Sequence, residues 1–314
     1  MNKDSKIFVA GHKGLVGSAI MKKLKNENYT NIITRDRKEV DLMNQKEVED
    51  FFSKETPEYI FLCAAKVGGI HDNNIRRAEF IYENMMIQNN VIHNSYKNGV
   101  KKLLFLASSC IYPKNCLQPI KEEYLLTSEL EQTNEPYAIA KISGLKMIEN
   151  YNKQYGLNYI SVMPTNLYGS LLDNYDLETS HVFAAMIRKF HEAKINNTDI
   201  TLWGDGSPYR EFLHVDDLAD ALLFLMNNYD KNQHLNIGTE KDLTIKELAI
   251  KISSVVGFKG TIVWDGTKPN GTHKKLLDVS KLSNLGWNYS IELDAGIKST
   301  YELFKKNYMN YIKS

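Results

Sequence analysis

The stretch Ile7-Phe8-Val9-Ala10-Gly11-His12-Lys13-Gly14-Leu15-Val16-Gly17 predicts a strand, a glycine-rich turn and the start of a helix. The four apolar residues are typical of a buried parallel strand, and apolar residues at helical spacing follow the turn. Gly11 permits the tight turn, Gly14 lets the backbone approach a pyrophosphate, and Gly17 lets helix and strand pack closely. We predict a dinucleotide-binding turn; a plain tight turn is the alternative. The residues predicted to bind the cofactor here are Gly11, Lys13, Gly14, Leu15, Val16 and Gly17.

A group of cations follows the second predicted strand, residues 31–34. Domains that bind NAD place an acidic residue near this point, where it binds the ribose 2′-hydroxyl. Here Arg35 and Arg37 stand at the strand end, and Lys13 lies in the glycine turn. Three cations suit a 2′-phosphate, so the sequence favours NADP(H). Asp36 is the argument for NAD, and a solvated basic turn without a ligand is a further alternative.

Further buried strands are predicted at residues 59–65, 102–107 and 159–163, with helical segments between them. This alternation predicts an α/β fold with a doubly wound parallel sheet, a Rossmann domain. We predict that residues 1–166 and 205–240 form this domain. Residues 167–204 and 241–314 would form a smaller, discontinuous α+β substrate domain, with the ligand site in the cleft between the two.

Composition excludes several classes of protein. The chain has 314 residues, of which 43% are hydrophobic and 25% charged, and its net charge is +1. This balance is typical of a soluble globular protein and argues against nucleic-acid or membrane partners. The cysteines, Cys63, Cys110 and Cys116, have no metal-ligand spacing, so we predict free thiols and no metal. No segment resembles a signal sequence or a membrane span, which predicts a cytoplasmic location.

The segment Asn134-Glu135-Pro136-Tyr137-Ala138-Ile139-Ala140-Lys141 contains a candidate for proton transfer. Pro136 suits the first turn of a helix, and Tyr137 and Lys141 then share one helical face. A neighbouring ammonium favours the ionised form of a phenol, which makes the pair a plausible acid. The same spacing recurs at Tyr301 and Lys305, which we interpret as an exposed helix pair.

A serine at a strand end (Ser108), a Tyr-x-x-x-Lys pair and an N-terminal glycine turn together resemble the extended short-chain dehydrogenase/reductase family. Four longer motifs resemble its GDP-L-fucose synthase branch, whose members are GDP-4-keto-6-deoxy-mannose 3,5-epimerase/4-reductases. Related members act on GDP-linked 6-deoxy-heptoses, some only as C4 reductases. The motifs are residues 64–70 (AAKVGGI), 108–114 (SSCIYPK), 134–141 (NEPYAIAK) and 163–169 (MPTNLYG), and the resemblance covers almost the whole chain.

The resemblance implies an NADPH-dependent C4 ketoreductase of a GDP-linked 4-keto-6-deoxy sugar. Ser108 would bond the ketone oxygen, Tyr137 would donate a proton, and Lys141 would lower the pKa of the phenol and bond the nicotinamide ribose. Cys110 and His181 would invert C3 and C5, since inversion beside a ketone needs a base on one side and an acid on the other. The alternatives are a turn cap for Ser108, a small buried hydrophobe for Cys110 and a structural role for His181.

The remaining contacts are also implied by the resemblance. Arg210 suits the diphosphate because a guanidinium can grip two oxygens. Trp203 would lie near the guanine; packing in a core is its alternative. A homodimer would form through the helices at 78–98 and 137–155. The further cofactor residues are Ala64, Ala65, Lys66, Lys141, Pro164, Asn166, Leu167 and His181, and the substrate residues are Ser109, Asn166, Lys189, Trp203, Arg210 and Asp278.

Two segments depart from the family pattern. Residues 170–181 form an altered loop that reads one residue longer, and Asn270 and His273 differ from the residues usual in the substrate-lid segment. The sugar, hexose or heptose, is therefore left open, as is the epimerase activity. Two other functions are weighed: an NAD-dependent nucleotide-sugar epimerase or dehydratase, and a nucleotide sensor that has lost turnover.

Overall fold

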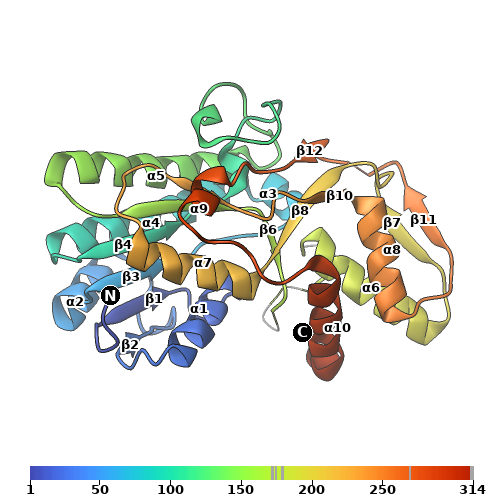
Figure 1. The fold of residues 1–314 in the computed structure, drawn as a ribbon, viewed down its shortest axis with the longest axis horizontal. Helices are drawn as coiled ribbons and strands as arrows, with labels where there is room; N and C mark the ends of the chain where they lie inside the picture. The colour runs from blue at the N-terminus through green and yellow to red at the C-terminus, as the bar shows by residue number, and fades with distance from the viewer. Residues whose placement is uncertain (171–172, 174, 178–179, 269, 312–314) are drawn as a thin grey trace.

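A six-stranded parallel sheet lies at the centre of the larger part of the molecule (Figure 1). The structure is a computed structural model and describes residues 1–170, 173, 175–177, 180–268 and 270–311. The strand order is β2-β1-β3-β4-β5-β9, so the direction of winding reverses between β1 and β3, where ligands of such sheets bind. The strands are β1 (Ile7–Ala10), β2 (Ile32–Ile33), β3 (Tyr59–Leu62), β4 (Lys102–Leu106), β5 (Ile160–Pro164) and β9 (Leu235–Ile237).

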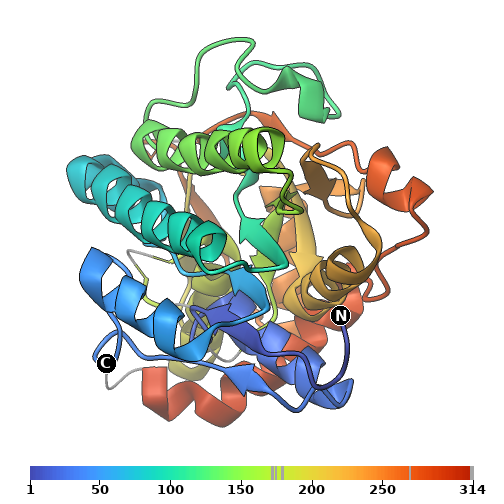
Figure 2. The ribbon, with the colours of Figure 1, turned by 90° about the vertical axis from the view of Figure 1, so that its left-hand side faces the viewer.

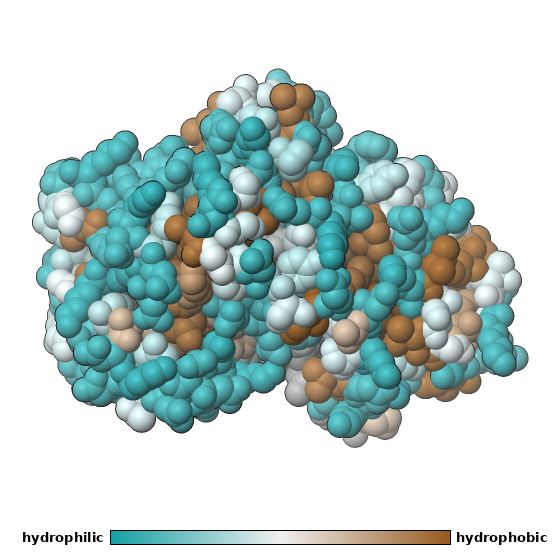
Figure 3. All heavy atoms as spheres, in the orientation of Figure 1, coloured by the Kyte–Doolittle hydropathy of each residue, from teal (hydrophilic) through white to brown (hydrophobic). Residues whose placement is uncertain are grey.

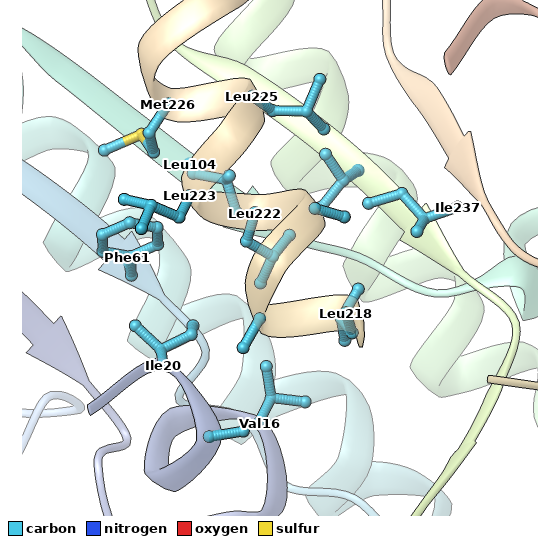
Figure 4. Packing of buried hydrophobic residues seen from close by; sticks show 14 of the residues in the cluster. Val16, Ile20, Phe61, Leu104, Leu218, Leu222, Leu223, Leu225, Met226 and Ile237 are labelled. Atoms are coloured by element: carbon cyan, nitrogen blue, oxygen red, sulfur yellow. The ribbon is translucent and has the colours of Figure 1, made fainter. Parts of the chain in front are cut away.

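Helices cover both faces of this sheet, which confirms the predicted fold class. Successive residues of a strand point to opposite faces, so Ile7 belongs to one core and Phe8 to the other. Helices α1 (Leu15–Asn26) and α7 (Val215–Asn228) cover the first face, where their apolar residues pack around Phe61 of β3 (Figure 4). The other face carries α2 (Gln45–Glu55), α4 (Arg77–Lys97) and α5 (Glu135–Tyr155), and Figure 2 shows α4 and α5 side by side.

The remaining strands form two smaller sheets. Strand β8 (Tyr209–His214) pairs with β6 (Asn166–Tyr168), β10 (Asp242–Thr244) and β12 (Lys274–Lys275). Strand β7 (Ile200–Trp203) pairs with β11 (Ile262–Asp265). Helices α6 (Val182–Asn196), α8 (Ile245–Val256) and α10 (Leu293–Tyr311) contribute to a third core beside these sheets.

The predicted Rossmann segment 205–240 divides between these sheets. Its helix α7 and strand β9 join the large sheet, whereas β8 lies in a smaller one because all its ladder partners are there. The division of the chain into two domains stays a prediction.

Tyr301 does not lie on an exposed face of α10, so that interpretation was wrong. Its side chain is buried in the third core, and its hydroxyl lies 3.0 Å from Nδ1 of His191 on α6. Lys305 does reach solvent, where it pairs with Glu302 at 2.8 Å. The spacing in sequence could not show that α6 packs against this turn of α10.

Hydrophilic residues dominate the face drawn in Figure 3, with hydrophobic ones scattered between them. None of the helices in the described ranges combines the length and apolarity needed to cross a bilayer. Within the same ranges, no three His, Cys, Asp or Glu side chains gather as metal ligands would. The cysteines are free.

Candidate active site

The glycine turn after β1 has the shape that a pyrophosphate requires. Gly11 has φ +87°, a left-handed conformation, and a Cβ there would lie 2.7 Å from the backbone nitrogen of Ala64 at the end of β3. A Cβ on Gly17 would lie 2.1 Å from the carbonyl oxygen of Gly11. Helix α1 starts behind Gly14 with no side-chain cap and no acidic residue in its first turn. Its N–H groups and positive dipole end therefore suit phosphate oxygens.

The three predicted cations each pair with a carboxylate of their own. Lys13 pairs with Asp36 at 2.6 Å, Arg35 with Glu55 at 2.5 Å, and Arg37 with Asp41 at 3.3 Å. The Lys13 pair joins the glycine turn to the end of β2, as expected of a 2′-phosphate site. A bound 2′-phosphate would compete with these carboxylates, a competition that residue types alone did not reveal.

The segment after β3 is held by a residue that the sequence analysis missed. Buried Asn84 of α4 accepts from the backbone N–H of Lys66 and donates to its carbonyl, each at 3.0 Å. The ammonium of Lys66 pairs with Glu79 and Glu83 of the same helix. Asn84 thus fixes the course of Ala64, Ala65 and Lys66 past the sheet edge. Nothing in the sequence around Asn84 predicted this contact with Lys66.

Ser108 and Cys110 follow β4 in a short 3₁₀ turn, η1 (Ser109–Ile111). The Ser108 hydroxyl oxygen accepts from the backbone N–H of Cys110 at 3.3 Å, so the predicted capping role is present. Capping uses a lone pair and leaves the hydroxyl proton available for a ketone oxygen. Ser109 and Cys110 are both buried, and burial raises the pKa of the Cys110 thiol.

Tyr137 and Lys141 lie on α5, one turn apart, against the end of β4. Lys141 is 3% exposed, and its ammonium donates to the carbonyl of Leu106 at 2.9 Å. The same nitrogen lies 5.7 Å from the centroid of the Tyr137 ring. The Tyr137 ring meets Phe80 edge-on at 6.3 Å. These contacts fix the phenol beside the sheet edge.

Burial decides the protonation of this pair. It lowers the pKa of Lys141 to about 8, with the neighbouring Cys110 and Cys63 thiols acting in the opposite direction. Burial, followed by the Cys110 thiol, raises the pKa of Tyr137 well above its ordinary value. The lowering of the phenol's pKa that the resemblance implies for Lys141 is not seen, because desolvation dominates. The phenol is accordingly held as an acid with its proton in place.

His181 lies at the N-cap of α6 and is exposed to solvent. Surrounding protein atoms still displace enough water to lower the pKa of its imidazole. Within the part of the chain that the structure describes, no hydrogen bond or charge contact joins it to Cys110. Of the altered loop before it, residues 171, 172, 174, 178 and 179 lie outside the described residues.

Two cations meet across the ladder between β8 and β12. Arg210 stands opposite Lys275 in the register, and burial lowers the pKa of both. Among the described residues, no carboxylate lies within ion-pair distance of either one; Arg210 donates to the carbonyl of Tyr209 at 2.7 Å. Adjacent cations without counter-charges are typical of an anion site. Lys275 was not among the residues predicted from the sequence.

Trp203 is 45% exposed at the end of β7, which excludes the core alternative. The ammonium groups of Lys189 and Lys268 lie 5.9 and 5.4 Å from its ring. Burial lowers the pKa of Lys189, whose ammonium also donates to the carbonyl of Thr201 at 3.1 Å. A half-exposed indole between cations offers a stacking surface for an aromatic base.

Four other predicted residues hold or extend the local structure. The amide of Asn166 donates to the carbonyl of Glu211 at 2.8 Å, which ties β6 to β8. Asp278 accepts from the N–H and hydroxyl of Ser280 at 3.0 and 2.5 Å, at the start of α9 (Ser280–Asn284). The carboxylate of Asp278 is thus committed to this turn and not to the cations of β8 and β12. Pro164 ends β5 and Leu167 lies in β6.

A glycine turn, a strand-end serine and a buried Tyr-x-x-x-Lys lysine at one sheet edge define a dehydrogenase/reductase of the short-chain class. The sequence profile of the NAD dependent epimerase/dehydratase family matches residues 7–238, and the chain belongs to this family.

Several known proteins are similar to it along their whole length. "Putative GDP-L-fucose synthase 2" of Arabidopsis thaliana is 57% identical over 308 residues, covering 98% of this chain and 94% of the relative. A GDP-mannoheptose C4 reductase from Campylobacter jejuni with NADP bound has a TM-score of 0.89 and 43% identity, covering 97% of this chain and 99% of that one. A GDP-6-OMe-4-keto-L-xylo-heptose reductase from C. jejuni has a TM-score of 0.93 and 41% identity, with coverage of 98% and 99%.

Proposed function

We propose that the chain is an NADPH-dependent reductase of the C4 ketone of a GDP-linked 4-keto-6-deoxy sugar, hexose or heptose. The observation that carries the proposal is the group of Ser108, Tyr137 and buried Lys141 at the carboxyl edge of β4, beside the glycine turn. Relatives named as GDP-L-fucose synthases and GDP-heptose reductases, one with NADP bound, support the substrate class and the cofactor.

The shape of the glycine turn suits a pyrophosphate, and the remaining cofactor contacts are assigned from this starting point. The backbone from Gly11 to Gly17 would take the pyrophosphate, Lys13 and Arg35 the 2′-phosphate, and Lys141 the ribose next to the nicotinamide. NADPH, when bound, supplies a hydride to C4. Tyr137 donates its proton to the C4 oxygen while Ser108 donates a hydrogen bond to it, so the alkoxide never forms as a free charge. The diphosphate would lie on Arg210 and Lys275, and the guanine against Trp203.

We propose that Cys110 and His181 add 3,5-epimerase activity before the reduction. Inversion at C3 or C5 removes a proton from one side of the carbon and returns one from the other. The burial of Cys110 keeps a proton on the thiol, and the lowered pKa keeps His181 neutral. One group can therefore give a proton while the other takes one. A C4 reductase without epimerase activity is the second candidate, because the altered loop 170–181 precedes His181.

Purified protein, NADPH and a GDP-4-keto-6-deoxy sugar test the proposal. We expect loss of NADPH absorbance with a hexose or a heptose substrate, and faster turnover with one of them identifies the sugar. No oxidation with either would contradict the reductase. Conversion of the sugar by protein that keeps its NAD bound, with no net oxidation of NADPH, would instead favour the epimerase or dehydratase alternative.

Epimerase activity has a separate readout. In deuterated water the enzyme should place deuterium at C3 and C5 of the sugar, and Cys110→Ser should abolish this exchange while reduction of an epimerised substrate persists. If exchange did not exceed the enzyme-free control while reduction persisted, the protein would be a C4 reductase without epimerase activity. Mass spectrometry of the product separates the two outcomes.

We also infer a homodimer through α4 and α5. Tyr82 and Tyr155 are 62% and 41% exposed on these helices, and the rings of Tyr96 and Tyr155 stack at 4.1 Å. Light scattering after gel filtration should give twice the mass of the chain. A replacement such as Tyr155→Glu should shift the protein to monomers, and a monomeric unsubstituted protein would contradict the inference.

A further inference from the structure

A small pocket beside Cys110 carries polar groups that the proposed reaction leaves unused. Its lining residues include Cys110, Lys114, Gln118, Glu131, Asn134 and Lys275. It therefore touches the thiol of the proposed catalytic group and one of the two unpaired cations on β12 and β8. A sugar held between a diphosphate site and a ketone site would pass along such a pocket.

Asn134 behaves unlike an ordinary residue at the start of a helix. It occupies the N-cap of α5, where an Asn side chain usually accepts from N–H groups of the first turn. Here it makes no capping bond. Its Oδ1 is buried and, among the described residues, has no hydrogen-bond donor. A buried acceptor in this state calls for a ligand or a water that donates to it.

Glu131 presents a second acceptor in the same pocket. Its Oε2 is buried, and no described residue gives it a hydrogen bond. Lys114 lies 2.9 Å away as an ion pair without hydrogen-bond geometry, and its side chain is 46% exposed against 17% for Glu131. Burial acts to raise the pKa of Glu131, but Lys114 and Thr133 lower it by more. An ionised carboxylate at this depth accepts hydrogen bonds and donates none.

We propose that Glu131 and Asn134 form a subsite that accepts hydrogen bonds from hydroxyl groups of the substrate's sugar. The inference rests on the proposed function and adds two binding residues to it. Sugar hydroxyls are suitable donors for the Asn134 oxygen, which lacks one, and for the Glu131 carboxylate, which keeps lone pairs beside its ion pair with Lys114. Asn134 precedes Tyr137 by three residues, so helix α5 fixes the distance between the amide oxygen and the proton donor. The backbone N–H of Asn134 donates to the carbonyl of Glu131 at 3.2 Å, which holds the two residues in one turn.

Equilibrium binding tests the subsite without turnover. GDP-mannose carries sugar hydroxyls but no ketone, and GDP carries neither. The unsubstituted protein should bind GDP-mannose more tightly than GDP in isothermal titration. Glu131→Ala should weaken GDP-mannose about tenfold to a hundredfold, and Asn134→Ala about threefold to tenfold, with GDP and NADPH binding unchanged. Glu129→Ala, an exposed residue of the same loop, is the matched control and should change nothing.

Each other outcome overturns the subsite in a recognisable way. An equal loss of GDP and GDP-mannose affinity would show that the two residues only shape the loop. Unchanged GDP-mannose binding in both variants would show that the oxygens contact water alone. If the unsubstituted protein binds neither GDP nor GDP-mannose, the proposed substrate class fails and the subsite fails with it.

Discussion

Two Tyr-x-x-x-Lys pairs in this chain share their spacing but differ in their surroundings. In both, the ammonium lies near the tyrosine ring, at 5.7 Å for Lys141 and 5.0 Å for Lys305. Lys141 is buried, donates to a strand-end carbonyl and has its pKa lowered to about 8. Lys305 is exposed and pairs with Glu302, which raises its pKa. Spacing along a helix thus creates contact, but the neighbouring elements decide the chemistry.

The tyrosines differ in the same way. Tyr301 is committed to His191 inside the third core, so its hydroxyl has a partner within the protein. Tyr137 meets Phe80 edge-on at the sheet edge, near Ser108 and Cys110. A proton donor must be able to reach a substrate, and only the pair on α5 lies at the carboxyl ends of the strands. The same substitution should therefore affect catalysis in the pair on α5 and not in the pair on α10.

The largest difference is expected between Tyr137→Phe and Tyr301→Phe. Loss of the proton donor should slow NADPH oxidation by about 10²–10⁴-fold, because a positioned general acid contributes that much. NADPH binding, followed by the change in its fluorescence, should be retained. Tyr301→Phe should keep nearly full turnover. Equal activity of the two variants would remove the proton-donor role of Tyr137.

The lysines should differ in pH dependence. The pKa of Lys141 in the folded protein is about 8, below the 10.5 of an unperturbed lysine, so the ammonium is present below pH 8 and lost as the pH rises through that value. NADPH oxidation should therefore fall about tenfold per pH unit above 8. Lys141→Met should lower the rate at pH 7 and flatten this limb, whereas Lys305→Met should keep the profile. If the rate of the Lys141→Met variant still fell above pH 8, the fall would be due to the titration of another group.

Cofactor binding beside Tyr137 and Lys141 can be weakened without changing either residue. Arg35→Ala removes a cation that would meet the 2′-phosphate, and a charged hydrogen bond of this kind is worth about 1.5–3 kcal/mol. The Kd of NADPH should rise about tenfold to a hundredfold, and the Kd of NADH should change little. Lys46→Ala, which removes an exposed cation of α2 that was not assigned to the cofactor, is the control. Equal losses for both cofactors would contradict the 2′-phosphate contact.

The smallest expected effect concerns the stability of the second pair. Tyr301→Phe leaves Nδ1 of His191 without its buried partner, so the free energy of unfolding should fall by about 1–2 kcal/mol. Urea unfolding monitored by tryptophan fluorescence measures this loss. Lys305→Met should shift the midpoint by less, because exposed ion pairs contribute little. An unchanged midpoint for Tyr301→Phe would mean that the contact with His191 is not formed in solution.

Local patterns predicted most of the Rossmann part correctly. The run from Ile7 to Gly17 predicted β1, the turn and the start of α1, because a buried strand and a tight turn each need particular residue types in a fixed order. Thr244 caps α8 and forms a capping box with Glu247, a pattern of residue types that is likewise local. At the start of α7, His214 occupies the N-cap and accepts from Asp216 N–H at 3.2 Å, although two aspartates follow it. Several side chains compete for such a position, which leaves the cap open in the sequence.

The contacts that gather the site join residues far apart in the chain. Lys275 meets Arg210 because β12 pairs with β8, and two-residue strands such as β12 carry almost no periodic signal. Asn84 was invisible as the anchor of Lys66 because the bond depends on how α4 packs beside β3. The carboxylates that neutralise Lys13, Arg35 and Arg37 were likewise missed, since side-chain pairing depends on reach and direction. The sequence therefore predicted the cations but not the carboxylates that pair with them.

The sequence by itself determined the parallel sheet, the dinucleotide turn and the identity of the groups that can move protons. These features are local, because strand burial, tight turns and helical faces depend on neighbours within a few residues. Only the tertiary structure decided the surroundings that set the two Tyr-x-x-x-Lys pairs apart. Burial against β4 holds Tyr137 as an acid and lowers the pKa of Lys141, whereas the same spacing on α10 ends in a core contact and a surface ion pair. Desolvation and long-range pairing are properties of the packed molecule, and no spacing of residues encodes them.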